Sequence, residues 1–171
     1  MNFIFEGCDN TFKTTTLNAV QKKLVRAGKE TMRLNSSGIA SVELTDRYYT
    51  DMGRIMHNEP NISFLVDRAW LGEEVYGPMY RNRKLEDIRN FNRQLENNLT
   101  KDNCVIVYLY NDAEYLISHD DGLSFTTDLE KKKQELAAFE DAVDHSLCKV
   151  IKINVHDKTT EQITEEIFEN A

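Results

Sequence analysis

The chain has 171 residues, of which 40% are hydrophobic and 29% charged, with only two prolines. This length favours a single domain spanning residues 1–171, and the composition excludes a disordered or low-complexity chain. The formal net charge of −8 at pH 7 argues against a general nucleic-acid-binding protein, and we expect no nucleic-acid partner.

The charge is unevenly distributed along the chain. All nine arginines lie at or before Arg93, so residues 1–93 carry 14 basic and 12 acidic side chains, a net charge of +2. Residues 94–171 carry seven lysines and 17 acidic side chains, a net charge of −10. We therefore expect an anionic ligand to be held mainly by the first half.

The cysteines and the apolar runs bear on cellular location. Cys8, Cys104 and Cys148 are widely spaced, and the last two lie in or beside apolar runs, which is typical of buried, reduced thiols in a cytoplasmic protein. The N-terminal MNFIFEG lacks a basic region, and no stretch approaches 18 apolar residues. We expect neither a signal peptide nor a membrane span.

Short apolar runs alternate with helical patterns along the chain. In chain order, the patterns predict strand 3–5, helix 13–27, strand 30–34, helix 42–57, strand 63–66, helix 84–99, strand 104–110, helix 112–118, helix 128–146, strand 149–155 and helix 160–170. Residues 69–80 are mixed and aromatic and receive no element, and residues 119–127 form a polar loop. This order predicts an α/β fold with a mostly parallel, five-stranded sheet flanked by helices.

Two of the predicted helices have apolar stripes that we expect to face the core. The stripe of helix 42–57 comprises Leu44, Tyr48, Met52 and Ile55. The stripe of helix 128–146 comprises Leu129, Leu136, Phe139 and Val143. Helix 13–27 is followed by Gly28, which is expected to end it.

The turn after the first strand carries a phosphate-binding motif. Residues 7–14, GCDNTFKT, match G-x-x-x-x-G-K-[ST] except that Phe12 replaces the second glycine. In such a turn, backbone N–H groups and the start of the next helix surround phosphate oxygens with donors. The alternative is an ordinary polar turn between strand and helix. The predicted phosphate ligands are Gly7, Cys8, Asp9, Asn10, Thr11, Phe12, Lys13, Thr14 and Thr15.

The side chains of this motif have distinct expected roles. Lys13 adds a cation for the β- and γ-phosphates of ATP, and the Thr14 hydroxyl can reach a Mg²⁺ ion that bridges them. Thr15 can cap the helix or donate to a phosphate. Phe12 is expected to pack beneath the loop against the core, and Asn10 tolerates a left-handed backbone.

A second candidate feature ends the strand at 63–66. Asp67 and Arg68 follow it, at the edge of the sheet where ligands bind. A guanidinium suits a bidentate grip on a monophosphate, and a carboxylate suits contact with Mg²⁺. The alternative is a local ion pair.

Together these features resemble the thymidylate kinase-like branch of the P-loop kinases. The resemblance rests on FIFEGCDNTFKTTT at 3–16 and FLVDRAW at 64–70, and the run at 70–81 is similar to that of phage-borne members. It implies Mg²⁺-dependent transfer of the ATP γ-phosphoryl group to a deoxynucleoside monophosphate, dTMP or a related pyrimidine. It also implies a homodimer.

The resemblance assigns roles at the matching positions. Asp9 would accept a hydrogen bond from the acceptor's 3′-hydroxyl, Arg68 would hold its 5′-phosphate, Asp67 would assist the metal, and Lys13 would stabilise the transferred group. Asp9, Lys13 and Arg68 are therefore the candidate catalytic residues. The candidate substrate-binding residues are Asp9, Arg47, Arg54, Arg68, Tyr76 and Tyr80. Each tyrosine, and Trp70, also fits ordinary core packing.

The expected lid, at about 115–133, contains no arginine. Its cations are Lys131, Lys132, Lys133 and His119, and a lysine triplet on a helix is usually a solvated face, although one lysine could replace the lid arginine. A loop at 154–158 occupies the place where this family packs on adenine.

Two other functions remain open. A deoxynucleoside kinase would phosphorylate a 5′-hydroxyl and need a general base, for which Glu6 is the nearest candidate. A catalytically inactive nucleotide-binding regulator would explain Phe12 and the lid without arginine.

Overall fold

The computed structural model describes residues 1–36, 41–99, 104–122 and 124–171. Its elements are β1 (Asn2–Glu6), α1 (Lys13–Arg26), β2 (Glu30–Asn35), α2 (Val42–Asn58), β3 (Ile62–Asp67), α3 (Leu71–Tyr80), α4 (Leu85–Leu99), β4 (Cys104–Tyr110), α5 (Ala113–Ser118), α6 (Leu129–His145), β5 (Lys149–Asn154) and α7 (Thr160–Asn170). None of the helices in these ranges is long and apolar enough to cross a membrane.

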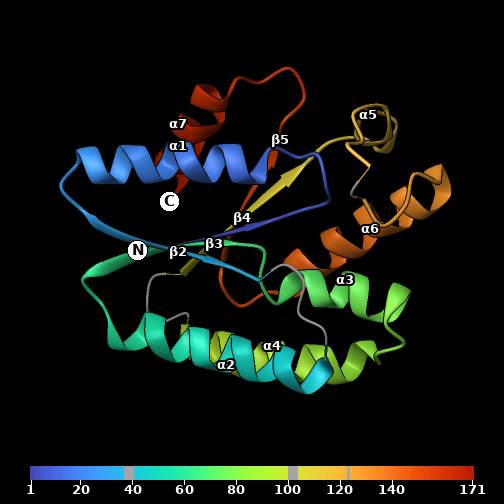
Figure 1. Ribbon diagram of the computed structural model, residues 1–171, viewed down its shortest axis with the longest axis horizontal. Helices are drawn as coiled ribbons and strands as arrows, with labels where there is room; N and C mark the ends of the chain where they lie inside the picture. The colour runs from blue at the N-terminus through green and yellow to red at the C-terminus, as the bar shows by residue number, and fades with distance from the viewer. Residues whose placement is uncertain (37–40, 100–103, 123) are drawn as a thin grey trace.

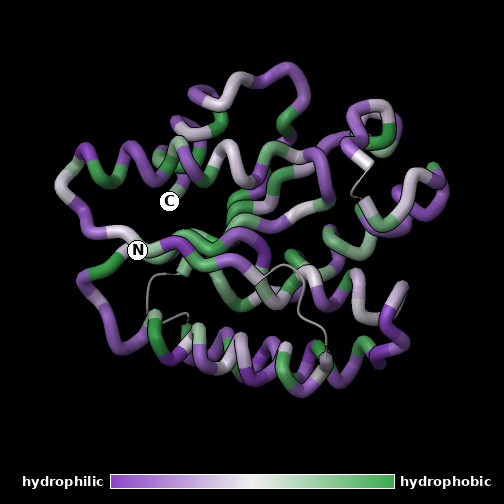
Figure 2. Tube along the Cα trace, in the orientation of Figure 1, coloured by the Kyte–Doolittle hydropathy of each residue, from purple (hydrophilic) through white to green (hydrophobic). Residues whose placement is uncertain are grey.

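The five strands form one parallel sheet in the order β2-β3-β1-β4-β5. The α/β fold class and the five predicted strands are thereby confirmed. The sheet is the middle of three layers, with α1 and α7 on one face and α2, α3, α4 and α6 on the other (Figure 1). The apolar colouring gathers on the strands at the centre (Figure 2).

Alternate residues of the central strands belong to two hydrophobic cores, one on each face of the sheet. Phe3 and Phe5 of β1 pack against Leu17 and Val20 of α1 on one face. Ile4 points to the opposite core, which contains Trp70 and Tyr76 among others. Because both faces are covered, β1, β3 and β4 are buried almost throughout, as continuous apolar runs predict.

Helix α3 lies in the segment to which the sequence pattern assigned no element. All of its residues from Leu71 to Gly77 are buried. A helix covered on every side lacks the one-sided apolar period by which helices are recognised. Trp70, which precedes it, is a core residue with no exposed surface.

The inward faces of two helices differ from those expected. In α2, Leu44 and Ile55 are exposed, and Met52 is the one buried residue of the predicted stripe. The other inward positions are Thr45, Tyr49 and Met56. Because most residues on both sides of the helix are apolar, the sequence alone could not decide which side faces the core. In α6, Leu129 is partly exposed, and Lys132 and Glu135 take inward positions beside Phe139.

Helix α1 begins in a left-handed turn at Phe12. This residue has φ 59° and ψ 22°, and its side chain is 43% exposed. The expectation that Phe12 packs beneath the loop is therefore wrong: the left-handed backbone directs the ring outward. Gly28, with φ 76°, follows α1 as expected.

Replacing Phe12 by glycine tests this backbone strain. We expect F12G to raise the free energy of unfolding by about 1 kcal/mol, because a left-handed non-glycine residue costs about 1–3 kcal/mol and glycine's greater unfolded-state entropy offsets part of that gain. The control T15G, at an exposed helical position, should lower it by about 0.5 kcal/mol. Urea denaturation measures both, and a loss in F12G equal to that in T15G would contradict the strain.

Candidate functional site

The phosphate loop, residues 7–12, is shaped by its contact with the neighbouring strand. Gly7 has φ 138°, and a Cβ atom there would lie 2.1 Å from the carbonyl oxygen of Leu109 in β4. No other residue fits this close approach. Asn10, at φ 65°, adopts the left-handed backbone that its side chain tolerates. Inside the loop, the Thr11 hydroxyl donates to the Cys8 carbonyl at 2.9 Å.

The ammonium group of Lys13 lies in the curve of this loop. It donates to the Cys8 carbonyl and, at 3.3 Å, to the Thr11 hydroxyl, and the side chain is buried. Burial, together with the nearby Arg68 guanidinium, lowers the pKa of Lys13 to about 8. An anion placed beside this amine would favour its charged form.

Asp67, the last residue of β3, connects this strand to the start of α1. Its Oδ2 atom accepts hydrogen bonds from the Thr14 hydroxyl at 2.7 Å and from Arg33 Nη2 at 3.0 Å. Arg33, on β2, also donates to Asn18 at 3.1 Å. No sequence pattern pointed to Arg33, because its place beside Asp67 depends on the pairing of β2 with β3.

Arg68 directly follows the end of β3. Its backbone is left-handed, with φ 66°, and its N–H donates to the Phe5 carbonyl at 3.0 Å. The guanidinium forms an ion pair with Asp9 of the phosphate loop. The two motifs that the sequence singled out are thus in direct contact.

A cavity of about 210 Å³ opens beside this ion pair. Asp9 and Arg68 line it together with Tyr76 from α3. The Tyr76 hydroxyl is buried and has no hydrogen-bond partner among the described residues. Arg81, which the sequence did not suggest, lies in the wall and pairs with Glu73.

Glu6, the last residue of β1, also lines this cavity. Its carboxylate is buried and accepts a hydrogen bond from the Ala69 N–H at 2.9 Å. Burial outweighs this bond and the nearby cations, and it raises the pKa of Glu6 to about 7. A carboxyl group with this pKa can exchange a proton near neutral pH.

A second cavity, of about 350 Å³, lies over the phosphate loop. It is lined by loop residues, Asp67 and Asp121, and it shares Asp9 and Arg68 with the first cavity. We call these two spaces the loop cavity and the side cavity. The Asp9–Arg68 pair is their common wall.

The segment between α5 and α6 lies against the phosphate loop. The Asn10 side-chain amide donates to the Leu116 carbonyl at 3.4 Å, to Asp120 at 3.3 Å and to Ser124 at 3.4 Å. Near the same end of the sheet, the Tyr115 ring stacks on His119 at 4.0 Å and meets His156 of the 154–158 loop edge-on at 5.7 Å.

The lysine triplet is not a uniform solvated face. Lys131 and Lys133 are exposed, but Lys132 is buried and donates to Glu135 Oε2 at 2.6 Å. Glu135 is also buried and accepts from the Tyr80 hydroxyl at 2.7 Å through Oε1. Lys132 and Glu135 are an i,i+3 pair of opposite charges, and nothing in the sequence indicated that such a pair would be buried.

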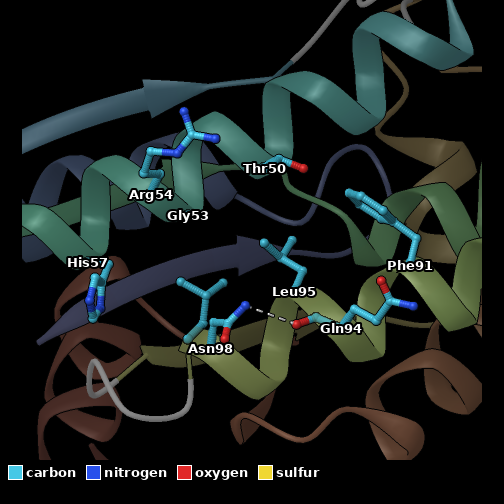
Figure 3. A pocket seen from close by; sticks show the side chains of 9 residues that line it. Thr50, Gly53, Arg54, His57, Phe91, Gln94, Leu95 and Asn98 are labelled. Carbon is cyan, nitrogen blue, oxygen red and sulfur yellow. Dashed lines mark hydrogen bonds between the residues drawn. The ribbon is translucent and has the colours of Figure 1, made fainter.

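Three of the predicted substrate-binding residues, Arg47, Arg54 and Tyr80, line neither cavity. Arg47 and Arg54 are exposed on α2 and pair with Asp51 at 3.8 Å and 3.3 Å. Arg54 borders a separate groove of about 360 Å³ between α2 and α4, which includes Phe91 and Leu95 but no residue of the phosphate loop (Figure 3).

Comparison with known proteins bears on the fold. No protein-family model and no curated protein matches the sequence. Among solved structures, the chain is similar to the crystal structure of the YorR protein from Bacillus subtilis in complex with phosphorylated GDP. The TM-score is 0.71 at 16% identity, and the match covers 99% of this chain and 94% of that one. The chain therefore shares the α/β fold of that structure.

The buried Lys132–Glu135 pair predicts an uneven response to removing lysines. K132M should lower the free energy of unfolding by about 3 kcal/mol, because it leaves the Glu135 carboxylate buried without its cation. K131M, at an exposed position on the same helix, should change it by less than about 0.5 kcal/mol. The double variant K132M/E135M should recover most of the loss. Urea denaturation decides, and equal effects of K132M and K131M would contradict the buried pair.

Proposed function

We propose that this protein transfers the γ-phosphoryl group of ATP to a deoxynucleoside monophosphate. One observation carries the proposal: the loop cavity and the side cavity share Asp9 and Arg68 as a common wall. Two bound nucleotides could therefore bring their phosphates together at this pair. Transfer between phosphates depends mainly on such positioning and on compensation of charge.

The loop cavity supplies what a triphosphate donor needs. The loop backbone and the start of α1 offer N–H donors, and Lys13 offers a cation next to them. Arg33 is a second cation close by, paired with Asp67. We propose that ATP binds here, with its adenine toward Tyr115 and His156.

Mg²⁺ fits the oxygen atoms at this position. Thr14 and Asp67 provide a hydroxyl and a carboxylate that already touch, and no cluster of three or more His, Cys, Asp or Glu side chains suited to a metal occurs among the described residues. Mg²⁺ commonly binds through one or two protein oxygens together with substrate phosphates and water. When bound, it would neutralise charge on the phosphates.

The side cavity supplies the acceptor site in this proposal. Arg68 would hold the acceptor's phosphate, with Asp9 on the sugar 3′-hydroxyl and Tyr76 beside the sugar. A phosphate oxygen of the acceptor forms the new P–O bond, and the bond from the γ-phosphorus to ADP breaks. The acceptor oxygen is already anionic, so no general base is required. We propose dTMP or a related pyrimidine nucleotide as acceptor, and the guanine nucleotide bound by YorR makes dGMP the first competitor to test.

Glu6 favours a second candidate function. A deoxynucleoside kinase deprotonates a 5′-hydroxyl, and Glu6 lines the side cavity with a pKa raised by burial to about 7. This carboxylate would be the base. The acceptor's chemistry therefore decides between a monophosphate kinase and a nucleoside kinase.

We also propose that the protein forms a homodimer. Leu44 and Ile55 of α2 are large apolar side chains that are 53% and 45% exposed. Sedimentation equilibrium should show a dimer that the variant L44K/I55K converts to a monomer. A wild-type monomer at micromolar concentration would contradict this part of the proposal.

The proposed reaction is tested by measuring ADP release with ATP and Mg²⁺ in the presence of dTMP, dCMP, dAMP, dGMP, dUMP or thymidine. We expect turnover with a monophosphate, its loss in K13A, and a fall in kcat/KM for the acceptor of on the order of 100-fold in R68A, because an anion loses its charge-paired partner. R93A, an exposed arginine on α4, serves as the control and should behave as the wild type.

Each alternative gives a different result in the same assay. Turnover with thymidine and with no monophosphate would replace the proposal by the nucleoside kinase. Absence of transfer to every acceptor, with ATP binding that is lost in K13A, would identify a nucleotide-binding regulator.

A further inference from the structure

Three aromatic rings stack together, and two of them, those of Tyr76 and Phe125, line the side cavity. Tyr76 and Tyr80 lie one turn apart on α3, and their ring centroids are 6.2 Å apart. Phe125, from the segment between α5 and α6, lies on both: its centroid is 4.9 Å from that of Tyr76 and 5.0 Å from that of Tyr80. The planes of Phe125 and Tyr80 differ by 13°. We call this group the aromatic platform.

Phe125 is the exposed member of the platform. It is 52% exposed, although it packs on two tyrosines, and it lines the side cavity together with Asp9 and Arg68. Its neighbours in sequence, Ser124 and Thr126, are polar. Part of the phenylalanine ring therefore remains available to a planar ligand in the cavity.

Residues of α6 hold the two tyrosines in place. The Tyr80 hydroxyl donates to Glu135, whose other oxygen is held by Lys132, and both charged side chains are buried. The Tyr76 ring meets the buried Phe139 ring edge-on, with centroids 5.8 Å apart and planes at 79°. Lys132 thus supports Tyr80 through Glu135 rather than pointing at the phosphates.

Phe125 is also tied to the phosphate loop. Ser124, its neighbour, accepts a hydrogen bond from the Asn10 side chain, as does Asp120 earlier in the segment. These contacts hold the segment beside both cavities, because Asp121 lines the loop cavity and Phe125 lines the side cavity. The position of the Phe125 ring is therefore linked to the conformation of the loop.

We propose that Phe125 is the stacking residue for the base of the nucleotide in the side cavity. This inference rests on the proposed function and adds that the segment between α5 and α6 supplies a wall of the acceptor site. The ligand class is a planar heteroaromatic base carried by a nucleoside monophosphate whose phosphate lies at Arg68. Stacking of a base on an aromatic side chain is tolerant of base identity, so Phe125 would favour bases as a class.

The test compares a nucleotide with the same molecule lacking its base. Dissociation constants are measured by ligand-observed NMR titration for 2-deoxyribose 5-phosphate and for the tightest-binding of dTMP, dCMP, dAMP and dGMP. We expect F125A to weaken the nucleotide on the order of tenfold and to leave 2-deoxyribose 5-phosphate unchanged. F125W should retain the wild-type affinities.

Two further variants separate stacking from a general loss of structure. L129A removes another partly exposed apolar side chain near the start of α6 that lies outside the side cavity, and it should bind both ligands as the wild type does. F125L keeps apolar packing but removes the aromatic face, and it should weaken the nucleotide selectively, as F125A does.

The outcomes distinguish this inference from the proposed function. If the wild type binds nucleotides but F125A and F125L bind them equally well or more tightly, or lose both ligands to the same extent, Phe125 is not the stacking residue and the proposed function stands. If the wild type binds none of the four monophosphates, the acceptor site itself is wrong and this inference falls with it.

Discussion

The parallel pairing of β1 with β3 is the constraint on which the site depends. Phe5 is in register with Asp67, and the Arg68 N–H donates to the Phe5 carbonyl at 3.0 Å. Because parallel strands end at the same edge, the phosphate loop and the Asp67-Arg68 pair lie side by side. A one-residue slip of β3 would turn Asp67 to the other face of the sheet and remove its hydrogen bond from Thr14.

The positive groups around the loop cavity come from the start of α1, from β2 and from the end of β3, rather than from the described residues between 115 and 133. Among the described residues near this cavity, Lys13, Arg33 and Arg68 all belong to the half of the chain that contains every arginine. The segment between α5 and α6 brings Asp120 and Asp121 to the loop instead. Lys132 of α6 is buried and is held by Glu135. Compensation of phosphate charge in the proposed reaction would therefore fall to Lys13 and the two arginines.

The sequence predicted those features that depend on local pattern. The central strands β1, β3 and β4 follow from continuous apolar runs, and the phosphate loop follows from a short motif between a strand and a helix. Features set by tertiary contacts were missed or misplaced: α3 is buried on all sides, α2 carries two apolar stripes, and Lys132 looks like a surface residue. Arg33 depends on strand register. Phe125 lies in the segment 119–127, in which Leu123 and Phe125 are the large apolar residues. No apolar periodicity therefore distinguished it.

The proposed function depends first on the binding of the ATP phosphates beside Lys13 in the loop cavity. Burial lowers the pKa of Lys13 to about 8, and a bound polyphosphate should raise it again. Calorimetric titration with Mg·ATP at about pH 9, in two buffers of different ionisation enthalpy, measures the protons taken up. We expect uptake approaching one proton per ATP in the wild type and close to none in K13R, because arginine stays charged at this pH. Absence of ATP binding, or wild-type binding without proton uptake, would contradict it.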